Sequence, residues 1–447
     1  MAFDEAIKDG VNVISISPGV GNKVPFYSDA LAVGAFSAVR KGIIVSAAAG
    51  NSGPGEFTAN NGAPWMLTVG DVGSSECEAG KLDTSNVTTK IVVCDAGINS
   101  GVAKGEAVKL VGGAGAILVS RKDLGEESLA AAHVLPAAGI TFAAAEKIKK
   151  YIRETESPVA TIVFLGTVIG RRQSAPRTAS FSGRGPNFVA PEILKPDATA
   201  PGVDILAAWT GENSPSQLAS DPRRVKFNVK SGTSVSGAHV SGIVALLRQS
   251  ALMTITYNVD NVGDIIKDMS TGEASTPFVH GAGHVDPNRA VDPGLVYDAN
   301  TDDYISFLCS LNYTAEQIAV LTRDGSVTNC STRPGSVGDH NYPAFSVVLR
   351  SGGGAVTQRR VVRNVGSNTK ATYTAKVTSP AGVRVKVEPL TLKFSSKRKT
   401  WEYMITFTPQ GNVTDKYTFG SIVWSDGKYK VTSPIAITWL ATQVAAM

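Results

Sequence analysis

The spacing of hydrophobic residues near the start of the chain alternates between buried-strand and helical patterns. Residues 11–17 (VNVISIS) and 42–51 (GIIVSAAAGN) are short apolar runs typical of buried strands, and residues 27–42 have the spacing of a helix. Strands that alternate with helices predict parallel βαβ units, whose functional loops lie at the carboxyl ends of the strands. Residues 2–8 have the pattern of the end of an amphipathic helix. Because a domain seldom begins within such a unit, we expect the chain to lack its natural N-terminal part.

Residues 73–166 have a different pattern, with short apolar runs among Gly and Ala. We interpret them as a small α+β module inserted between two parts, 1–72 and 167–310, of one α/β domain. The predicted strands are KIVVCDAG (90–97), GAGAILVS (113–120) and ATIVFLG (160–166), and the predicted helix is AAEKIKKYIRET (144–155).

From about residue 341 the apolar residues recur with a period of two. About seven short strands separated by turn residues predict a β-sandwich over 341–443. The predicted strands lie in RVVRNVG, TYTAKVTS, VRVKVEPLTLKFS, WEYMITFTP, FGSIVWSDG and YKVTSPIAIT.

Composition and charge then limit the classes of function. The 447 residues are 43% hydrophobic, which is typical of a globular protein with two or three domains, and 43 Lys and Arg against 38 Asp and Glu give a net charge of +5. The basic residues are scattered, and we interpret the densest cluster, SSKRKT at 395–400, as a solvated turn. No apolar run is long enough to span a membrane, and no basic-then-apolar leader marks a secretory signal. We therefore expect neither a nucleic-acid nor a membrane partner.

The four cysteines form two local pairs by spacing, without a CxxC motif or a nearby set of histidines, so we expect no zinc, other metal or cofactor. An even count suggests two disulfides and an oxidising compartment, although reduced thiols would fit the count equally. Four N-x-S/T triplets agree with secretion or arise by chance; they begin at Asn86, Asn312, Asn329 and Asn412.

Three stretches carry candidate chemistry. Ser234 follows a Gly-Thr turn at the start of an apolar helical run, where N–H groups and the helix dipole would stabilise an oxyanion. Taken alone, this motif equally fits a helix-capping serine. Asn51 follows a strand and could direct its amide at the same oxyanion, or be an ordinary turn residue. Residues 15–19 (SISPG) would suit edge-on binding of an extended peptide, or form a plain β–α turn.

Together the motifs resemble those of plant subtilisin-like serine proteases, the subtilases. They occur in the family's order over nearly the whole chain: GVNVISIS, IIVSAAAGNSGP, SFSGRGPN, ILKPDATAPGVDILAAW, SGTSVSGAHVSG, STPFVHGAGHVDPNRAVDPGLVYD and NYPAFSV. The resemblance implies a subtilisin-like parallel sheet with flanking helices, a protease-associated insert and a fibronectin-III-like C-terminal domain. It also implies polypeptide substrates, an extracellular location in the apoplast or cell wall, and a homodimer through the insert.

The resemblance also assigns roles to residues. Ser234 would be the nucleophile and Asn51 the oxyanion-hole residue. Local spacing, with the extracellular type of the family, predicts the disulfides Cys77–Cys94 and Cys309–Cys330. The predicted walls of the substrate cleft are Ser17, Pro18, Gly19, Ala47, Ala48, Ala49 and Gly50.

The chain departs from the family at its catalytic motifs. In the family the Asp and His motifs precede the strand that begins here at Val11, so this chain lacks both. None of the five histidines makes a good base, because each lies in the insert, on the helix of Ser234, in a non-catalytic motif or in the linker: His133, His239, His280, His284 and His340. We expect an endopeptidase by family that is inactive as this chain. The alternatives are a non-catalytic peptide- or partner-binding relative and a truncated gene product.

The helix after Ser234 should be the central buried helix, with one apolar face formed by Val240, Ile243, Val244 and Leu247. The family has further segments before Cys77 and after Gln249 that are missing here. We expect apolar surface to be exposed beside Ser234 and the chain to be aggregation-prone.

Overall fold

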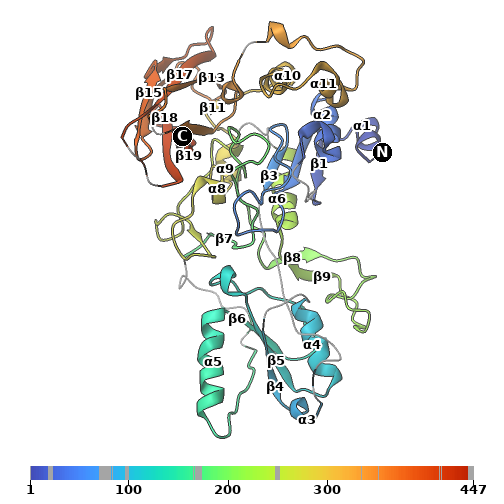
Figure 1. Ribbon diagram of the computed structural model, residues 1–447. Coiled ribbons are helices and arrows are strands. Elements are labelled where there is room, and N and C mark those ends of the chain that lie inside the picture. Colours follow the sequence, from blue (N-terminus) through green and yellow to red (C-terminus); the bar gives the residue numbers. More distant parts are fainter. Residues whose placement is uncertain are drawn as a thin grey trace, which may run out of the picture.

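The computed structural model has three parts, shown in Figure 1: a central domain, an insert below it and a sandwich at the upper left. We define the insert as residues 84–164 and the sandwich as residues 335–440, and the central domain contains most of the remainder. The described residues are 2–18, 24–69, 82, 84–95, 100–164, 166, 174–246, 252–333, 335–350, 352–411, 413 and 415–440.

A parallel sheet lies at the centre of the central domain. Its strands β1 (Val13–Ile16), β2 (Ile44–Ala48) and β3 (Leu67–Val69) lie in that order, so the predicted βαβ unit is confirmed. Helix α6 (Thr233–Leu246) contacts all three strands, and α2 (Ala30–Val39) packs on β2 and on α1 (Ala2–Lys8).

The apolar face of α6 is buried as predicted. Val240 and Val244 are 1% and 3% exposed, and Ile243 packs against the same core. Leu247 lies outside the described residues. The other side of α6, with Ala238, His239 and Gly242, is exposed, so α6 covers one face of the sheet and is not the central buried helix that was predicted.

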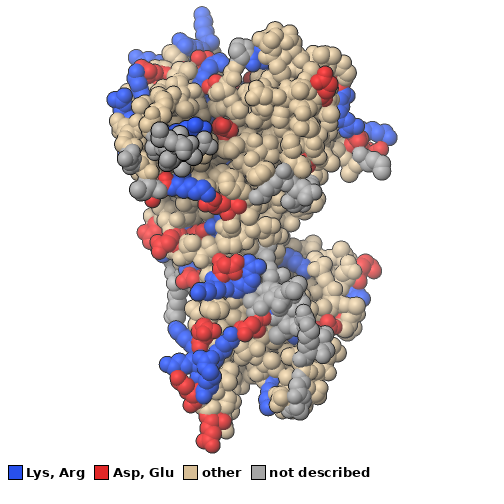
Figure 2. Space-filling model, viewed as in Figure 1, with Lys and Arg blue, Asp and Glu red and all other residues tan. Residues whose placement is uncertain are grey.

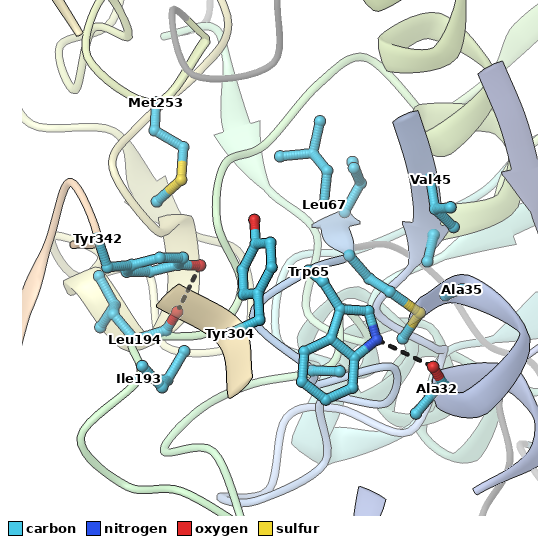
Figure 3. Close-up of a cluster of buried hydrophobic side chains, with 14 of the residues drawn as sticks. Ala32, Ala35, Val45, Trp65, Leu67, Ile193, Leu194, Met253, Tyr304 and Tyr342 are labelled. Carbon is cyan, nitrogen blue, oxygen red and sulfur yellow. Dashed lines mark hydrogen bonds between the residues drawn. The ribbon is translucent and has the colours of Figure 1, made fainter. Parts of the chain in front are cut away.

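Figure 3 shows part of this core, centred on the fully buried Trp65. The Trp65 ring meets the rings of Phe26 and Phe36 edge-on at centroid distances of 5.4 and 5.0 Å. Its indole N–H donates to the Ala32 carbonyl at 2.9 Å, so the polar atom of this large side chain is satisfied. Tyr342, near the start of the sandwich, reaches the same core.

The remainder of the central domain consists of short elements. They are η1 (Phe26–Ser28), β7 (Arg177–Thr178), β8 (Ile205–Ala208), β9 (Phe227–Lys230), β10 (Lys267–Asp268), α8 (Pro277–His280), α9 (Pro287–Ala290), α10 (Thr301–Ser310), α11 (Ala315–Thr322) and η3 (Cys330–Thr332). Strands β8 and β9 form an antiparallel hairpin, and β7 pairs with β10 in parallel. Among the described residues, no helix is both long and apolar enough to cross a membrane.

The insert is a three-stranded parallel sheet with helices, but one of its strands was wrongly predicted. The third strand is formed by residues 137–140, whereas residues 160–164 are irregular, with Phe164 93% exposed. The sequence Ala-Ala-Gly-Ile of the true strand is too small and too short to give an apolar signal; pairing with its neighbour determines it. The elements are α3 (Thr84–Val87), β4 (Ile91–Cys94), α4 (Gly101–Leu110), β5 (Gly115–Val119), η2 (Lys122–Leu124), β6 (Ala137–Ile140) and α5 (Phe142–Glu154).

The sandwich contains two packed sheets, in the orders β11-β13-β17-β15 and β12-β19-β18-β14-β16. Strand β11 (Leu295–Val296) comes from well before the predicted boundary at 341, and Leu295 is fully buried in the sandwich core. The other elements are η4 (Val337–Asp339), β12 (Phe345–Arg350), β13 (Val356–Asn364), β14 (Thr372–Thr378), β15 (Val383–Glu388), β16 (Thr391–Lys393), β17 (Thr400–Pro409), β18 (Tyr417–Ser425) and β19 (Lys430–Leu440).

The predicted disulfide between Cys309 and Cys330 is confirmed, with the two Cα atoms 5.3 Å apart. It joins the end of α10 to η3. Cys94 is disulfide-bonded, but Cys77 lies outside the described residues, so the Cys77–Cys94 pairing stays a prediction.

Candidate active site

Ser234 lies in the first turn of α6, directly after strand β9. The turn that precedes it is fixed by Gly232, whose N–H donates to the Gly202 carbonyl at 2.9 Å. The Gly232 carbonyl in turn accepts from the N–H groups of Val235 and Ser236 at 2.8 and 3.2 Å. The first turn of α6 is also bonded to the segment at Ala200, because the Ser236 hydroxyl donates to the Ala200 carbonyl at 3.0 Å. Ser234 itself is half-buried.

Asn51 contacts Thr233, the residue before Ser234, although it is far away in sequence. Its Oδ1 accepts from the Thr233 hydroxyl at 2.7 Å and from the Thr233 N–H at 3.3 Å, across 182 positions of sequence. Because both bonds use the amide oxygen, they direct the Nδ2 group away from Thr233, and Asn51 is exposed.

The N–H groups around Ser234 can be accounted for one by one. Thr233 donates to Asn51, and Val235 and Ser236 donate to Gly232. The N–H of Ser234 has no hydrogen-bond partner among the described residues, as is typical of the first turn of a helix. The free N–H of Ser234 therefore lies at the positive end of the helix dipole, and the amide of Asn51 is bonded to the residue before it.

The loop that carries Asn51 is held by backbone and side-chain hydrogen bonds. Gly53 N–H donates to the Phe181 carbonyl at 2.8 Å, and Gly183 N–H donates to the Gly50 carbonyl at 2.9 Å. Asn61 was missed by the sequence analysis. Its Nδ2 donates to Ala48 O at 2.8 Å and to Pro18 O at 3.1 Å, so it joins the two loops predicted to wall the cleft. No local pattern distinguishes Asn61 from its neighbour Asn60.

The predicted wall residues differ in accessibility. Ser17 and Pro18 are exposed and Gly50 is half-buried, so these three present surface to a ligand. The segment Ala47–Ala49 is fully buried beneath them and presents none. Gly19 lies outside the described residues.

Comparison of the sequence with known proteins shows the family to which the chain belongs. The sequence profile of the subtilase family matches residues 1–283, which is more than half of the chain. The chain belongs to the subtilase family. Residues 339–437 match the fibronectin type-III domain, in agreement with the predicted C-terminal sandwich.

Similar subtilases occur in Arabidopsis thaliana. The chain is 45% identical to subtilisin-like protease SBT1.4 and 43% identical to subtilisin-like protease SBT1.7, in both cases over 98% of its own length. It spans 64% and 65% of the lengths of those two relatives.

Each of the five histidines of this subtilase is a candidate base for Ser234. No histidine hydrogen-bonds to Ser234 among the described residues. His239 is exposed on α6, and His133 belongs to the insert. Burial lowers the pKa of His280 to about 4, and its Nδ1 lies 2.7 Å from the Ser275 hydroxyl. These three are therefore not placed to take the Ser234 proton.

The other two histidines are structural as well. Burial, helped by the charges of Arg360 and Lys195, lowers the pKa of His340 to about 3, and its ring packs against aromatic rings of the core. His284 is held by its own backbone neighbour, with Nδ1 3.1 Å from the Val285 carbonyl, and burial lowers its pKa.

A buried ion pair lies beside strand β3 and was not anticipated from the sequence. Lys195 Nζ lies 2.8 Å from Asp197 Oδ2, and both side chains are at most 1% exposed. Asp197 also accepts from Thr68 N–H at 2.7 Å, and Lys195 donates to the Met66 carbonyl at 2.8 Å. Burial raises the pKa of Asp197 and lowers that of Lys195. The pair ties β3 to the segment that runs on to Ala200 beside α6.

Proposed function

We propose that this chain carries the nucleophile and the oxyanion hole of a subtilisin-like serine endopeptidase. Ser234 would attack the carbonyl carbon of a peptide bond and form an acyl-enzyme. The observation that carries the proposal is the pair of hydrogen bonds from Thr233 to Asn51, next to Ser234. Membership of the subtilase family supports a polypeptide substrate.

Two donors would stabilise the negative charge that develops on the carbonyl oxygen. They are the backbone N–H of Ser234 and the Nδ2 group of Asn51, whose oxygen is already held by Thr233. Such donors act by being fixed before the reaction, and loss of one costs about 100- to 1,000-fold in kcat, as measured in subtilisin itself. The loop walls at Ser17, Pro18 and Gly50 would bind the peptide in an extended form.

Removal of the Ser234 proton requires a base, and none of the described histidines is in place for it. In subtilisin itself, loss of the nucleophile's base lowers kcat about a millionfold. We therefore propose that the chain as given has no measurable peptidase turnover.

A direct test is to express the chain and measure cleavage of a broad peptide library together with labelling of Ser234 by a fluorophosphonate. The expected result is no turnover and no labelling above that of Ser234→Ala. Turnover that Ser234→Ala abolishes would contradict the proposed inactivity and would mean that another residue acts as the base.

A second function, peptide binding without cleavage, would use the exposed loop residues Ser17 and Pro18. A peptide aldehyde or an uncleaved peptide should then bind with an affinity that Asn51→Ala or Pro18→Ala weakens. Affinities of both variants equal to that of wild type would contradict a peptide site at these two loops.

We further propose that residues 73–166 form a domain of the protease-associated type and that the protein acts outside the cell. The domain ranges 1–72, 167–310 and 341–443 stay predictions.

Extracellular location is supported by the Cys309–Cys330 disulfide and by the exposure of Asn86, Asn312 and Asn329 as glycosylation sites. Asn412 lies outside the described residues. Mass spectrometry of the plant-expressed protein, before and after enzymatic deglycosylation, tests the glycosylation sites.

A further inference from the structure

Charge is divided unevenly along the chain. Residues 341–440 contain 15 Lys and Arg but only four Asp and Glu, whereas residues 1–340 contain 28 and 34. The small net charge of the whole chain therefore combines a strongly basic sandwich with a mildly acidic remainder. In Figure 2, Lys and Arg side chains occur at several points over the sandwich, at the upper left.

The imbalance is greatest on one of the two sheets. The five strands β12, β19, β18, β14 and β16 contain no Asp or Glu. Pairing aligns their side chains: Tyr373 lies opposite Leu392 in one pair of strands, and Trp424 lies opposite Val431 in another. All four are fully buried, so they mark the inner face of the sheet.

The alternate residues form the outer face. Lys376 on β14 lies opposite Val423, Lys393 on β16 lies opposite Thr372, and Lys430 on β19 lies opposite Ser425. The three lysines are exposed. None has an ion pair among the described residues of the chain, although the side chains of other sandwich lysines do, as in the pair Lys386–Glu388. We name these three lysines with the hydroxyl residues Thr372, Thr374, Ser425 and Thr432 the lysine face.

The lysine face lacks the unoccupied aromatic rings that are typical of protein-binding and nucleic-acid-binding surfaces. The aromatic residues of the same outer face, Tyr417 and Phe419, lie at the other end of β18 and are occupied by Phe278 of the central domain, at ring distances of 5.1 and 5.6 Å. A third aromatic residue, Trp401, donates its indole N–H to the Lys393 carbonyl at 2.7 Å, but the Arg398 guanidinium lies over its ring, 3.3 Å from the centroid. Because these rings are already occupied, the lysine face has no typical hot spot for a protein and no platform for stacking bases. It offers spaced ammonium groups and hydroxyls on a regular sheet.

We propose that the lysine face binds a polyuronate, a polysaccharide with a carboxylate on each sugar. The ammonium groups would pair with carboxylates, and the threonine and serine hydroxyls would hydrogen-bond to sugar hydroxyls. The Cys309–Cys330 disulfide is typical of an oxidising compartment, which favours an extracellular polysaccharide over nucleic acid. The binding is independent of Ser234 and of the proposed peptidase function.

The test measures binding of the full chain to immobilised polygalacturonate. Binding should weaken steeply with added salt, because ion pairs at an exposed surface are screened. Methyl-esterified polygalacturonate, which keeps the sugars but loses the charge, should bind at least about tenfold more weakly. The variant Lys376→Glu/Lys393→Glu/Lys430→Glu should lose at least about tenfold in affinity, a loss that corresponds to about 1.4 kcal/mol.

A matched control reverses three exposed lysines of the insert, Lys109→Glu/Lys147→Glu/Lys150→Glu, and gives the same net charge. Its affinity should stay within about twofold of wild type. Equal loss in both triple variants would mean that net charge alone governs binding and would overturn the proposal. Wild-type binding that survives methyl-esterification would also overturn it, as would tighter binding to vesicles of phosphatidylserine than to polygalacturonate. Circular dichroism of each variant verifies the fold.

Discussion

At the scale of single residues, two glycines near the proposed site differ in the space around them. A Cβ at Gly183 would lie 2.4 Å from the Ala49 carbonyl oxygen, whereas a Cβ at Gly242, on the exposed side of α6, meets nothing within 4 Å. Gly183→Ala should destabilise the protein by about 2 kcal/mol or more, because backbone must move. Gly242→Ala should stabilise it by up to about 1 kcal/mol, because Ala is the better helix former. Urea unfolding of both variants measures the contrast, and equal shifts would contradict the close approach at Gly183.

The buried pair Lys195–Asp197 gives a second prediction at this scale. Lys195→Met leaves the Asp197 carboxylate buried without its cation, which should cost about 3–5 kcal/mol of unfolding free energy. The matched control is Lys386→Met, which breaks the exposed pair with Glu388 and should cost at most about 1 kcal/mol. Similar losses for the two variants in urea unfolding would show that the Lys195 pair is not sealed from water.

At the scale of elements, one contact between the insert and the central domain is made by the buried residue Glu127. This residue is 2% exposed, and its Oε2 accepts from the N–H of Ser180 at 3.2 Å and from the Ser180 hydroxyl. Its Oε1 is buried without a partner among the described residues. Burial, and to a smaller extent the charge of Asp204, raises the pKa of Glu127 to about 7, against the opposing hydrogen bonds from Ser180 and the charge of Arg184.

The raised pKa predicts how the stability of this contact depends on pH. The folded protein binds the Glu127 proton more tightly than the unfolded chain, so the stabilisation is complete below about pH 4.5 and is lost as pH rises through about 7. The loss amounts to at most about 3 kcal/mol. Urea unfolding between pH 4.5 and 8 should show this decline in wild type and a flatter profile in Glu127→Gln. The exposed neighbour variant Glu126→Gln should keep the wild-type slope, and an unchanged slope in Glu127→Gln would contradict the assignment.

Prediction from sequence was uneven among the elements for a physical reason. The strands β1 and β2 and most strands of the sandwich were found because each has a strong local period or an apolar run, whereas β12 was not among the predicted strands. Strand β6 and the two-residue β11 lack such a signal, since they are strands only through pairing with β5 and β13. Residues 160–166 have the apolar composition of a strand but no partner strand among the described residues. Apolar composition alone therefore gave a wrong strand prediction here.

At the scale of the whole molecule, apolar surface is exposed on the hairpin that leads to Ser234. Leu206 on β8 is 69% exposed and Phe227 on β9 is 62% exposed, and the register Leu206↔Val229 and Ala208↔Phe227 puts both on one face. Exposed apolar patches promote association.

The chain should therefore self-associate at micromolar concentration, and Leu206→Gln/Phe227→Gln should reduce this association. Light scattering coupled to size-exclusion chromatography measures it. As a control, Val327→Gln replaces a single side chain that is 85% exposed and should leave association unchanged. A monomeric wild type would contradict the prediction.

The sequence by itself determined the features that depend on neighbouring residues: the βαβ pattern, the period-two strands of the sandwich, the helix that starts at Ser234 and the short-range Cys309–Cys330 pair. Only the tertiary structure decided which distant groups meet. Asn51 contacts Thr233 across 182 positions, and lysines that are scattered along the sequence lie on one sheet face. The reason is that periodicity fixes which side of an element a residue occupies, whereas the packing and register of strands far apart in sequence fix what lies beside it.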